Sequence, residues 1–164
     1  MNKVLVVDVE KCTGCKICVV ACSSAKERVF DPIKARIRIV KEESSGLSVP
    51  LLCEQCERPP CQASCPVGAI TKDTGTGIVK IDPDKCTGCG CCKQVCPFGS
   101  ETIKIRQNIA IKCDLCDSKP ECVKVCLSGA LQYLPADPFN VKKKRDCAEK
   151  RTLTLKHLAT MKGA

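Results

Sequence analysis

The stretch that decides the fold is Asp84–Gly99, with the sequence DKCTGCGCCKQVCPFG. Its spaced cysteines and a following proline form the pattern C-x2-C-x2-C-x3-C-P, with Cys86, Cys89, Cys92 and Cys96 at the ligand positions. In this pattern three thiolates hold one [4Fe–4S] cubane and the fourth reaches a different cubane. The stretch therefore predicts an iron–sulfur protein with more than one cluster.

Three further groups of four cysteines occur in the chain, and the stretch above is the third group of the series. The first group is Cys12, Cys15, Cys18 and Cys22. The second is Cys53, Cys56, Cys61 and Cys65, and the fourth is Cys113, Cys116, Cys122 and Cys126. Sixteen of the 18 cysteines belong to these groups, which predicts four [4Fe–4S] clusters.

The groups repeat within the chain. The first and third align at an offset of 74 residues, and the second and fourth at 60 and then 61. The chain is therefore predicted to be a duplicated pair of cluster motifs, with residues 31–52 as the main insertion. In this alignment Cys92 matches Cys18, whereas Cys91 matches Ile17, so we expect Cys91 to be a small buried apolar residue. Cys147 has no companion at ligand spacing and is expected to be a free thiol.

Short elements are expected between the groups. Residues 4–9 read as a strand, 16–26 as a short helix and 78–81 as a strand. Residues 35–41 alternate apolar and basic side chains, and 47–52 are expected to pair with them in a hairpin. We favour a surface location for this hairpin; the alternative is that it docks a partner subunit.

Two more elements are expected after the third group. Residues 102–112 alternate and predict a hairpin that turns at Gln107–Asn108. Residues 135–164 form a basic C-terminal arm, in which 146–161 is expected to be helical, with Leu153, Leu155, Leu158 and Met161 on one side. His157 is expected to be exposed.

Large apolar side chains are scarce: the chain has three Phe, one Tyr and no Trp. A chain of 164 residues normally depends on an apolar core, so we expect the clusters to fill the interior. The iron-free chain is then predicted to be largely unfolded, since a ligand that binds only the folded state stabilises folding.

Composition argues against several other classes. A disulfide scaffold is disfavoured because the spacings suit metal centres and no signal peptide precedes the first group. No apolar run reaches the ~20 residues of a membrane span, and a cytoplasmic location is expected. The formal charge of +9 is offset by about −8 from four oxidised cubanes with their thiolates, so nucleic acid is not needed to explain it.

The order of the groups, the CP that ends the third and the PPC within the second resemble the electron-transfer subunits of the dimethyl-sulfoxide-reductase iron–sulfur family. The resemblance covers about residues 4–133. The chain departs from many members in its compact fourth group and in having no appended anchor or export signal. It looks most similar to the small polyferredoxin subunit of tungsten-dependent aldehyde oxidoreductase complexes, followed by the partner of carbon monoxide dehydrogenase.

The resemblance implies an α+β, duplicated bacterial-ferredoxin-like fold over residues 1–134. Two intertwined halves of short strands and short helices would be followed by the arm. It also implies crossed ligation, in which three cysteines of one group join the last cysteine of another. The implied sets are Cys12, Cys15, Cys18 with Cys126; Cys113, Cys116, Cys122 with Cys22; Cys53, Cys56, Cys61 with Cys96; and Cys86, Cys89, Cys92 with Cys65.

The expected function is single-electron transfer, because no residue set resembles a catalytic centre. The partners implied are a large catalytic redox subunit, a tungsten- or molybdenum-pterin aldehyde oxidoreductase in the first instance, and a second acceptor such as a flavin or NAD subunit. Carbon monoxide dehydrogenase, formate dehydrogenase and hydrogenase are alternative partners. Copies stacked head to tail, a free ferredoxin, and a zinc-ribbon module are the remaining hypotheses.

Overall fold

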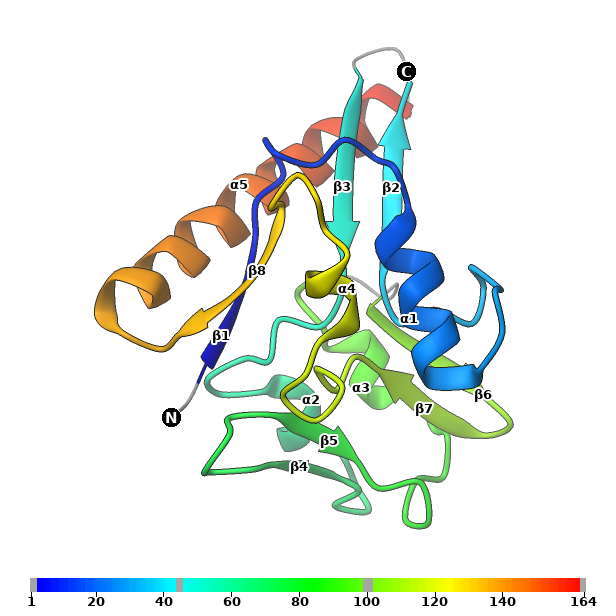
Figure 1. Ribbon diagram of the computed structural model, residues 1–164. Helices are drawn as coiled ribbons and strands as arrows, with labels where there is room; N and C mark the ends of the chain where they lie inside the picture. Colours follow the sequence, from blue (N-terminus) through cyan, green and yellow to red (C-terminus); the bar gives the residue numbers. More distant parts are fainter. Residues whose placement is uncertain (1–2, 44–45, 99–101, 163–164) are drawn as a thin grey trace.

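The structure is a computed structural model and describes residues 3–43, 46–98 and 102–162. Within these ranges the chain forms four separate two-stranded antiparallel sheets and five helices, of which three are single turns. Figure 1 shows the short elements gathered on one side of a long C-terminal helix. This is the small α+β, ferredoxin-like fold with a C-terminal helix that the resemblance implied.

The first and fourth cysteine groups share one half of the fold. Strand β1 (Lys3–Val7) pairs with β8 (Leu131–Pro135), although 123 residues separate the two strands. Helix α1 (Ile17–Glu27), which carries Cys18 and Cys22, packs against α4 (Glu121–Lys124). We call this half the outer module.

The second and third groups share the other half, which we call the inner module. Strand β4 (Ile70–Lys72) pairs with β5 (Val79–Ile81), and α2 (Pro60–Ala63) packs against α3 (Cys91–Gln94). The two modules repeat one backbone connection: Asp8 N–H donates to Ala130 O, and Asp82 N–H donates to Ala69 O, both at 2.8 Å. These are equivalent positions in the sequence repeat, which therefore reflects a structural repeat.

Two hairpins complete the sheets. β6 (Ile103–Arg106) and β7 (Ile109–Lys112) are joined by Gln107 and Asn108, whose φ angles are 48° and 59°. Positive φ at both turn residues matches the twist of paired strands, and asparagine tolerates it well. The predicted hairpin and its turn are confirmed.

The other hairpin pairs β2 (Arg38–Glu42) with β3 (Leu47–Leu51), as expected, but it is not a surface appendage. Ile37 and Leu52, just outside its strands, are 2% and 1% exposed and belong to the core that contains the outer-module cysteines. Val49 and Leu51 form a smaller cluster with Leu155 of the C-terminal helix. Strand β3 is therefore largely buried between the outer module and that helix, whereas most of β2 is exposed or half-exposed.

Helix α5 (Pro138–Lys162) begins eight residues before the predicted start. Asp137 explains the earlier start, because its carboxylate accepts the Asn140 N–H at 2.8 Å and Pro138 follows at a position where the lost N–H costs nothing. Figure 1 shows α5 lying along β1 and reaching the β2–β3 hairpin. Leu155 faces the hairpin, whereas Leu153 is 65% exposed, so the two leucines do not share a face as predicted. The side chains of His157, Leu158 and Met161 lie outside the described residues.

A buried ion pair fastens α5 to the second cysteine group. Arg151 on the helix is 2% exposed and pairs with Glu54, which lies between Cys53 and Cys56 and is 6% exposed. The guanidinium also lies 5.7 Å from the ring centre of Phe98. The helix therefore anchors a loop that carries two cysteines.

We predict that Arg151→Met loosens this anchor and destabilises the protein by about 3–5 kcal/mol, because Glu54 is left as an unpaired buried charge. The matched control is Lys150→Met, which removes the neighbouring but exposed pair with Glu10 and is expected to change stability little. Thermal unfolding followed by far-ultraviolet circular dichroism under anaerobic conditions measures both. Equal midpoints for the two variants would contradict the anchoring role.

Candidate iron–sulfur sites

The first set of cysteines, which we call site A, consists of Cys12, Cys15, Cys18 and Cys126. Burial, reinforced by the sulfurs of Cys12, Cys126 and Cys15, raises the pKa of Cys18 to about 12. Cys126 therefore lies with the first group although it is 104 residues beyond Cys22. The pairing of β1 with β8 and of α1 with α4 produces this approach.

Site B consists of Cys22, Cys113, Cys116 and Cys122. Burial and then the sulfurs of Cys113, Cys22 and Cys116 raise the pKa of Cys122 far above its ordinary value. Cys22 is held by the backbone of the following loop, since Arg36 N–H donates to its Sγ at 3.2 Å. The last cysteine of the first group thus joins three cysteines of the fourth.

Site C consists of Cys53, Cys56, Cys61 and Cys96, which line one small cavity together with Pro60 and Phe98. Burial, followed by the charge of Cys53, raises the pKa of Cys56 to about 11. The Pro59–Pro60 pair starts α2, so that Cys61 turns back toward Cys53.

Site D consists of Cys65, Cys86, Cys89 and Cys92, which line another small cavity with Ala69 and Ala110. Cys91 lines this cavity as well and is half-buried, so the expectation of a buried apolar residue is wrong. It begins α3 beside Cys89, and the Cys91 N–H lowers the pKa of the Cys89 thiol. Cys147 lies apart on α5, where burial raises its pKa.

The backbone around the cysteines fits thiolate ligands. Ala69 N–H donates to Cys65 Sγ at 3.3 Å, and Leu131 N–H donates to Cys126 Sγ at 3.4 Å, at positions that the repeat makes nearly equivalent. Such N–H donors stabilise negative charge on sulfur. Gly88 has φ 68°, and a Cβ there would meet Asn108 O at 2.4 Å, so only glycine allows this close approach beside site D.

The raised pKa values have one chemical consequence. In this fold without iron, the raised pKa values keep the thiols of Cys18 and Cys56 neutral at pH 7, since burial and negative charge on neighbouring sulfurs both oppose ionisation. Iron must supply the positive charge that ionises them. The donor set of each site, four sulfurs with N–H donors nearby, fits a [4Fe–4S] cubane. Across the described residues, no group of three or more His, Cys, Asp or Glu side chains is placed to hold a single metal ion.

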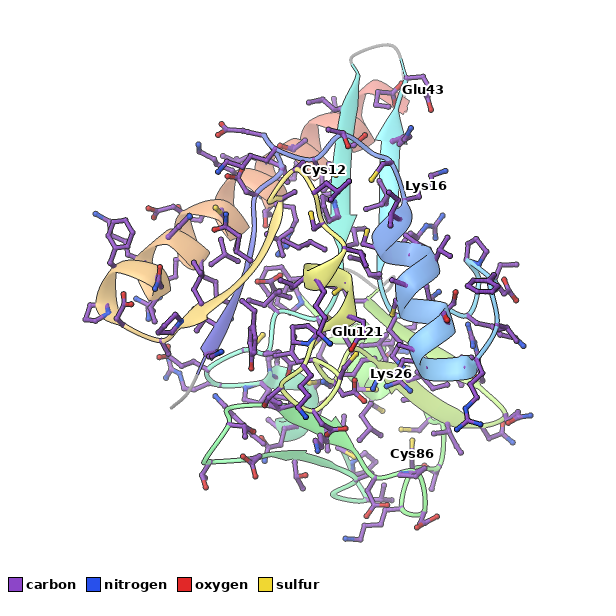
Figure 2. The ribbon with its side chains drawn as sticks, viewed as in Figure 1. Cys12, Lys16, Lys26, Glu43, Cys86 and Glu121 are labelled. Atoms are coloured by element: carbon purple, nitrogen blue, oxygen red, sulfur yellow. The ribbon has the colours of Figure 1, made fainter. Side chains whose placement is uncertain are left out.

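The four sites follow one another in the order A, B, C, D. The charge of Cys18 in site A contributes to the raised pKa of Cys122 in site B, and the charge of Cys53 in site C contributes to the raised pKa of Cys113 in site B. The charge of Cys92 in site D contributes to the raised pKa of Cys61 in site C. Figure 2 shows Cys12 of site A and Cys86 of site D at opposite ends of the group of short elements.

Sequence reasoning missed the polar residues buried between the sites. Glu54, Gln55 and Lys112 are 6%, 9% and 4% exposed, and each is adjacent to a cysteine in sequence. Their adjacency to cysteines was the available signal, but their burial depends on how the two modules pack.

Comparison with known proteins gives the class first: the chain is a ferredoxin-like electron-transfer protein. It belongs to the family described as "4Fe-4S dicluster domain", whose model matches residues 45–135. This membership supports the iron–sulfur interpretation over the zinc-ribbon alternative.

Several relatives carry electron-transfer names. The polyferredoxin-like subunit of an aliphatic sulfonate oxidoreductase from Pyrococcus furiosus is 38% identical over 71% of this chain and 67% of its own length. The electron transport protein HydN of Escherichia coli is 33% identical over 80% of this chain and 87% of its own. The thiosulfate reductase electron transfer subunit PhsB of Salmonella typhi is 31% identical over 85% and 79%.

Among solved structures, a chain of the BamBC active-site complex of benzoyl coenzyme A reductase is similar. Its identity is 29%, its TM-score is 0.46, and the match covers 80% of this chain and 78% of that one. In the part of the chain that the structure describes, no helix has the length and apolar character to cross a membrane.

The expected crossed ligation leads to a prediction at site D. Cys65→Ser is expected to lose one cluster, about a quarter of the iron, and to alter the same spectroscopic signal as Cys86→Ser, because both side chains would hold one cubane. Cys91→Ser is the matched control and should keep all clusters. Iron analysis and electron paramagnetic resonance measure these results. Different signals lost from Cys65→Ser and Cys86→Ser would contradict the ligand set.

Removal of iron is predicted to unfold most of the chain. Twelve of the sixteen grouped cysteines belong to the two main cores or pack against them, and without iron these cores would lose their filling and keep many buried polar thiols. Circular dichroism of chelator-treated, reduced protein measures the loss. A spectrum like that of the iron-loaded protein would contradict this prediction.

Proposed function

We propose that the chain relays single electrons through four [4Fe–4S] clusters held at sites A, B, C and D in that order. The observation that carries the proposal is the arrangement of the sites as a row, in which neighbouring sites are close enough for a cysteine of one to raise the pKa of a cysteine in the other. Bound clusters would supply the one-electron chemistry. The chain's own residues would hold the clusters in this order, shield those at sites B and C from water and donate N–H groups to their sulfurs.

The two ends of the row are where electrons would enter and leave. Among the grouped cysteines only Cys15 of site A and Cys89 of site D are exposed to solvent. An exposed apolar side chain lies close in sequence to a cysteine of each end site: Leu127, next to Cys126, is 92% exposed, and Val67, near Cys65, is 42% exposed. Exposed apolar surface next to a terminal redox site is suited to docking a redox partner that excludes water.

The partner we propose is the catalytic subunit of a tungsten- or molybdenum-pterin oxidoreductase, with a flavin or NAD protein as the second partner. The similarity to the Pyrococcus furiosus sulfonate oxidoreductase subunit supports this choice. Catalytic subunits of formate dehydrogenase, carbon monoxide dehydrogenase or hydrogenase type are the alternatives. A cytoplasmic location is part of the same proposal.

Head-to-tail stacking remains a prediction without a structural argument of its own. The C-terminal arm would be free to contact a second copy only if it did not pack on its own chain, and α5 packs along β1 and β3 of its own chain. That intramolecular packing accounts for the arm as far as the structure describes it.

The relay predicts about sixteen irons per chain and a brown protein whose clusters are reduced one electron at a time. Anaerobic purification, iron analysis and a reductive titration followed by visible absorbance test this. A colourless, zinc-loaded protein would refute the proposal. Purifying the native complex and identifying its large subunit tests the choice of partner.

The docking role of the ends is tested separately by Leu127→Asp and Val67→Asp. One of these variants is expected to slow electron exchange with the catalytic subunit at least tenfold, because a carboxylate would be buried against the partner. Phe139→Asp is the control, since Phe139 is 75% exposed on α5 and far in sequence from every grouped cysteine. Equal rates in all three variants, with full iron content, would contradict docking at the ends.

A further inference from the structure

Lys112 is a buried cation at the junction between the two modules. It is the last residue of β7, it is 4% exposed, and it directly precedes Cys113 of site B. Its ammonium donates to the carbonyl oxygen of Val79, a residue that lines the site C cavity, and to Cys113 O at 3.1 Å. The cation thus lies between the second and third sites of the row.

A closed set of hydrogen bonds holds this cation in place. Gln55, between Cys53 and Cys56 of site C, donates from Nε2 to Cys113 O at 2.7 Å. Its Oε1 accepts the Val79 N–H at 2.8 Å. Gln55 and Lys112 therefore both connect Val79 of the inner module to Cys113 of the outer module, and the junction has little freedom to relax.

No carboxylate of the described residues forms an ion pair with Lys112. The nearby Asp114 is engaged by Lys26 and by Arg36, at 2.7 and 2.8 Å. Burying an ammonium without an opposite charge is costly, and carbonyl oxygens compensate only part of that cost. The negative charge that the fold requires at this position must therefore come from sites B and C.

The cation lies against both neighbouring sites. Its ammonium hydrogen-bonds to Val79, which lines the site C cavity, and to Cys113 of site B. A buried positive charge beside two sites favours any further negative charge placed there, such as an added electron.

We propose that Lys112 is the shared counter-cation of the clusters at sites B and C and raises the reduction potentials of these two above those they would otherwise have. The inference rests on the proposed ligation of four clusters. The step concerned is the transfer of one electron to the cluster at site B or C from the neighbouring cluster at site A or D, with no proton transferred and no bond changed. Lys112 acts as a positioning residue for charge, and the effect is to ease transfer across the junction between the modules.

The test compares midpoint potentials in the purified, iron-loaded protein by redox titration monitored with electron paramagnetic resonance. Lys112→Gln keeps hydrogen-bond donors for the two carbonyl groups but removes the charge. It is expected to lower the potentials of two of the four clusters by at least a tenfold change in the reduction equilibrium, about 59 mV for one electron. Lys112→Arg keeps the charge and should keep all four potentials near their original values.

The matched control is Lys85→Gln. Lys85 also precedes a grouped cysteine, Cys86, but its side chain is 64% exposed, so solvent screens its charge. Four unchanged potentials in Lys112→Gln, or a shift no larger than that of Lys85→Gln, would overturn the proposal. A shift spread evenly over all four clusters would also overturn it.

Loss of clusters is informative as well. Iron missing from Lys112→Gln but retained in Lys112→Arg supports the counter-cation, because charge then decides whether the clusters stay. Iron missing from both variants overturns it, since shape alone would explain the loss. Low iron in the unaltered protein is a failure of the four-cluster function, which iron analysis separates from failure of this inference.

Discussion

Fourteen of the sixteen grouped cysteines are buried or half-buried in a chain that has three phenylalanines, one tyrosine and no tryptophan. The buried Val, Ile and Leu side chains share this interior with the cysteines, and sulfur that carries negative charge is costly to bury. The fold depends on packing these cysteines and compensating their charge at once. Iron would fill the space and ionise the thiols, while backbone N–H groups at Cys22, Cys65 and Cys126 are already directed at sulfur.

Crossing of the chain between groups produces a row of sites. Each module combines segments from two cysteine groups, and in the proposed ligation the last cysteine of one group would complete the set of another. This arrangement ties distant parts of the chain together through the sites themselves. Between sites B and C the two modules meet through Gln55, Val79, Lys112 and Cys113.

Helix α5 stabilises the packing of the two modules. Its contacts with β1 and the β2–β3 hairpin cover the outer module, and Arg151 reaches the loop of site C through Glu54. One element therefore braces both modules. The β2–β3 hairpin, an insertion in the sequence repeat, packs against α5. This contact buries its residues Val49 and Leu51.

Cysteine spacing by itself determined the four groups, the duplication and the ferredoxin-like class, because ligand geometry restricts how far apart cysteines can lie along a short loop. Alternation and the Gln107–Asn108 pair located the β6–β7 hairpin, since local backbone preferences decide a tight turn. The half-buried place of Cys91 beside Cys89, the burial of strand β3 and the buried charges of Glu54, Arg151 and Lys112 were decided only in the tertiary structure. Burial is a property of how modules pack, and a residue's neighbours along the chain do not reveal which distant surface will cover it.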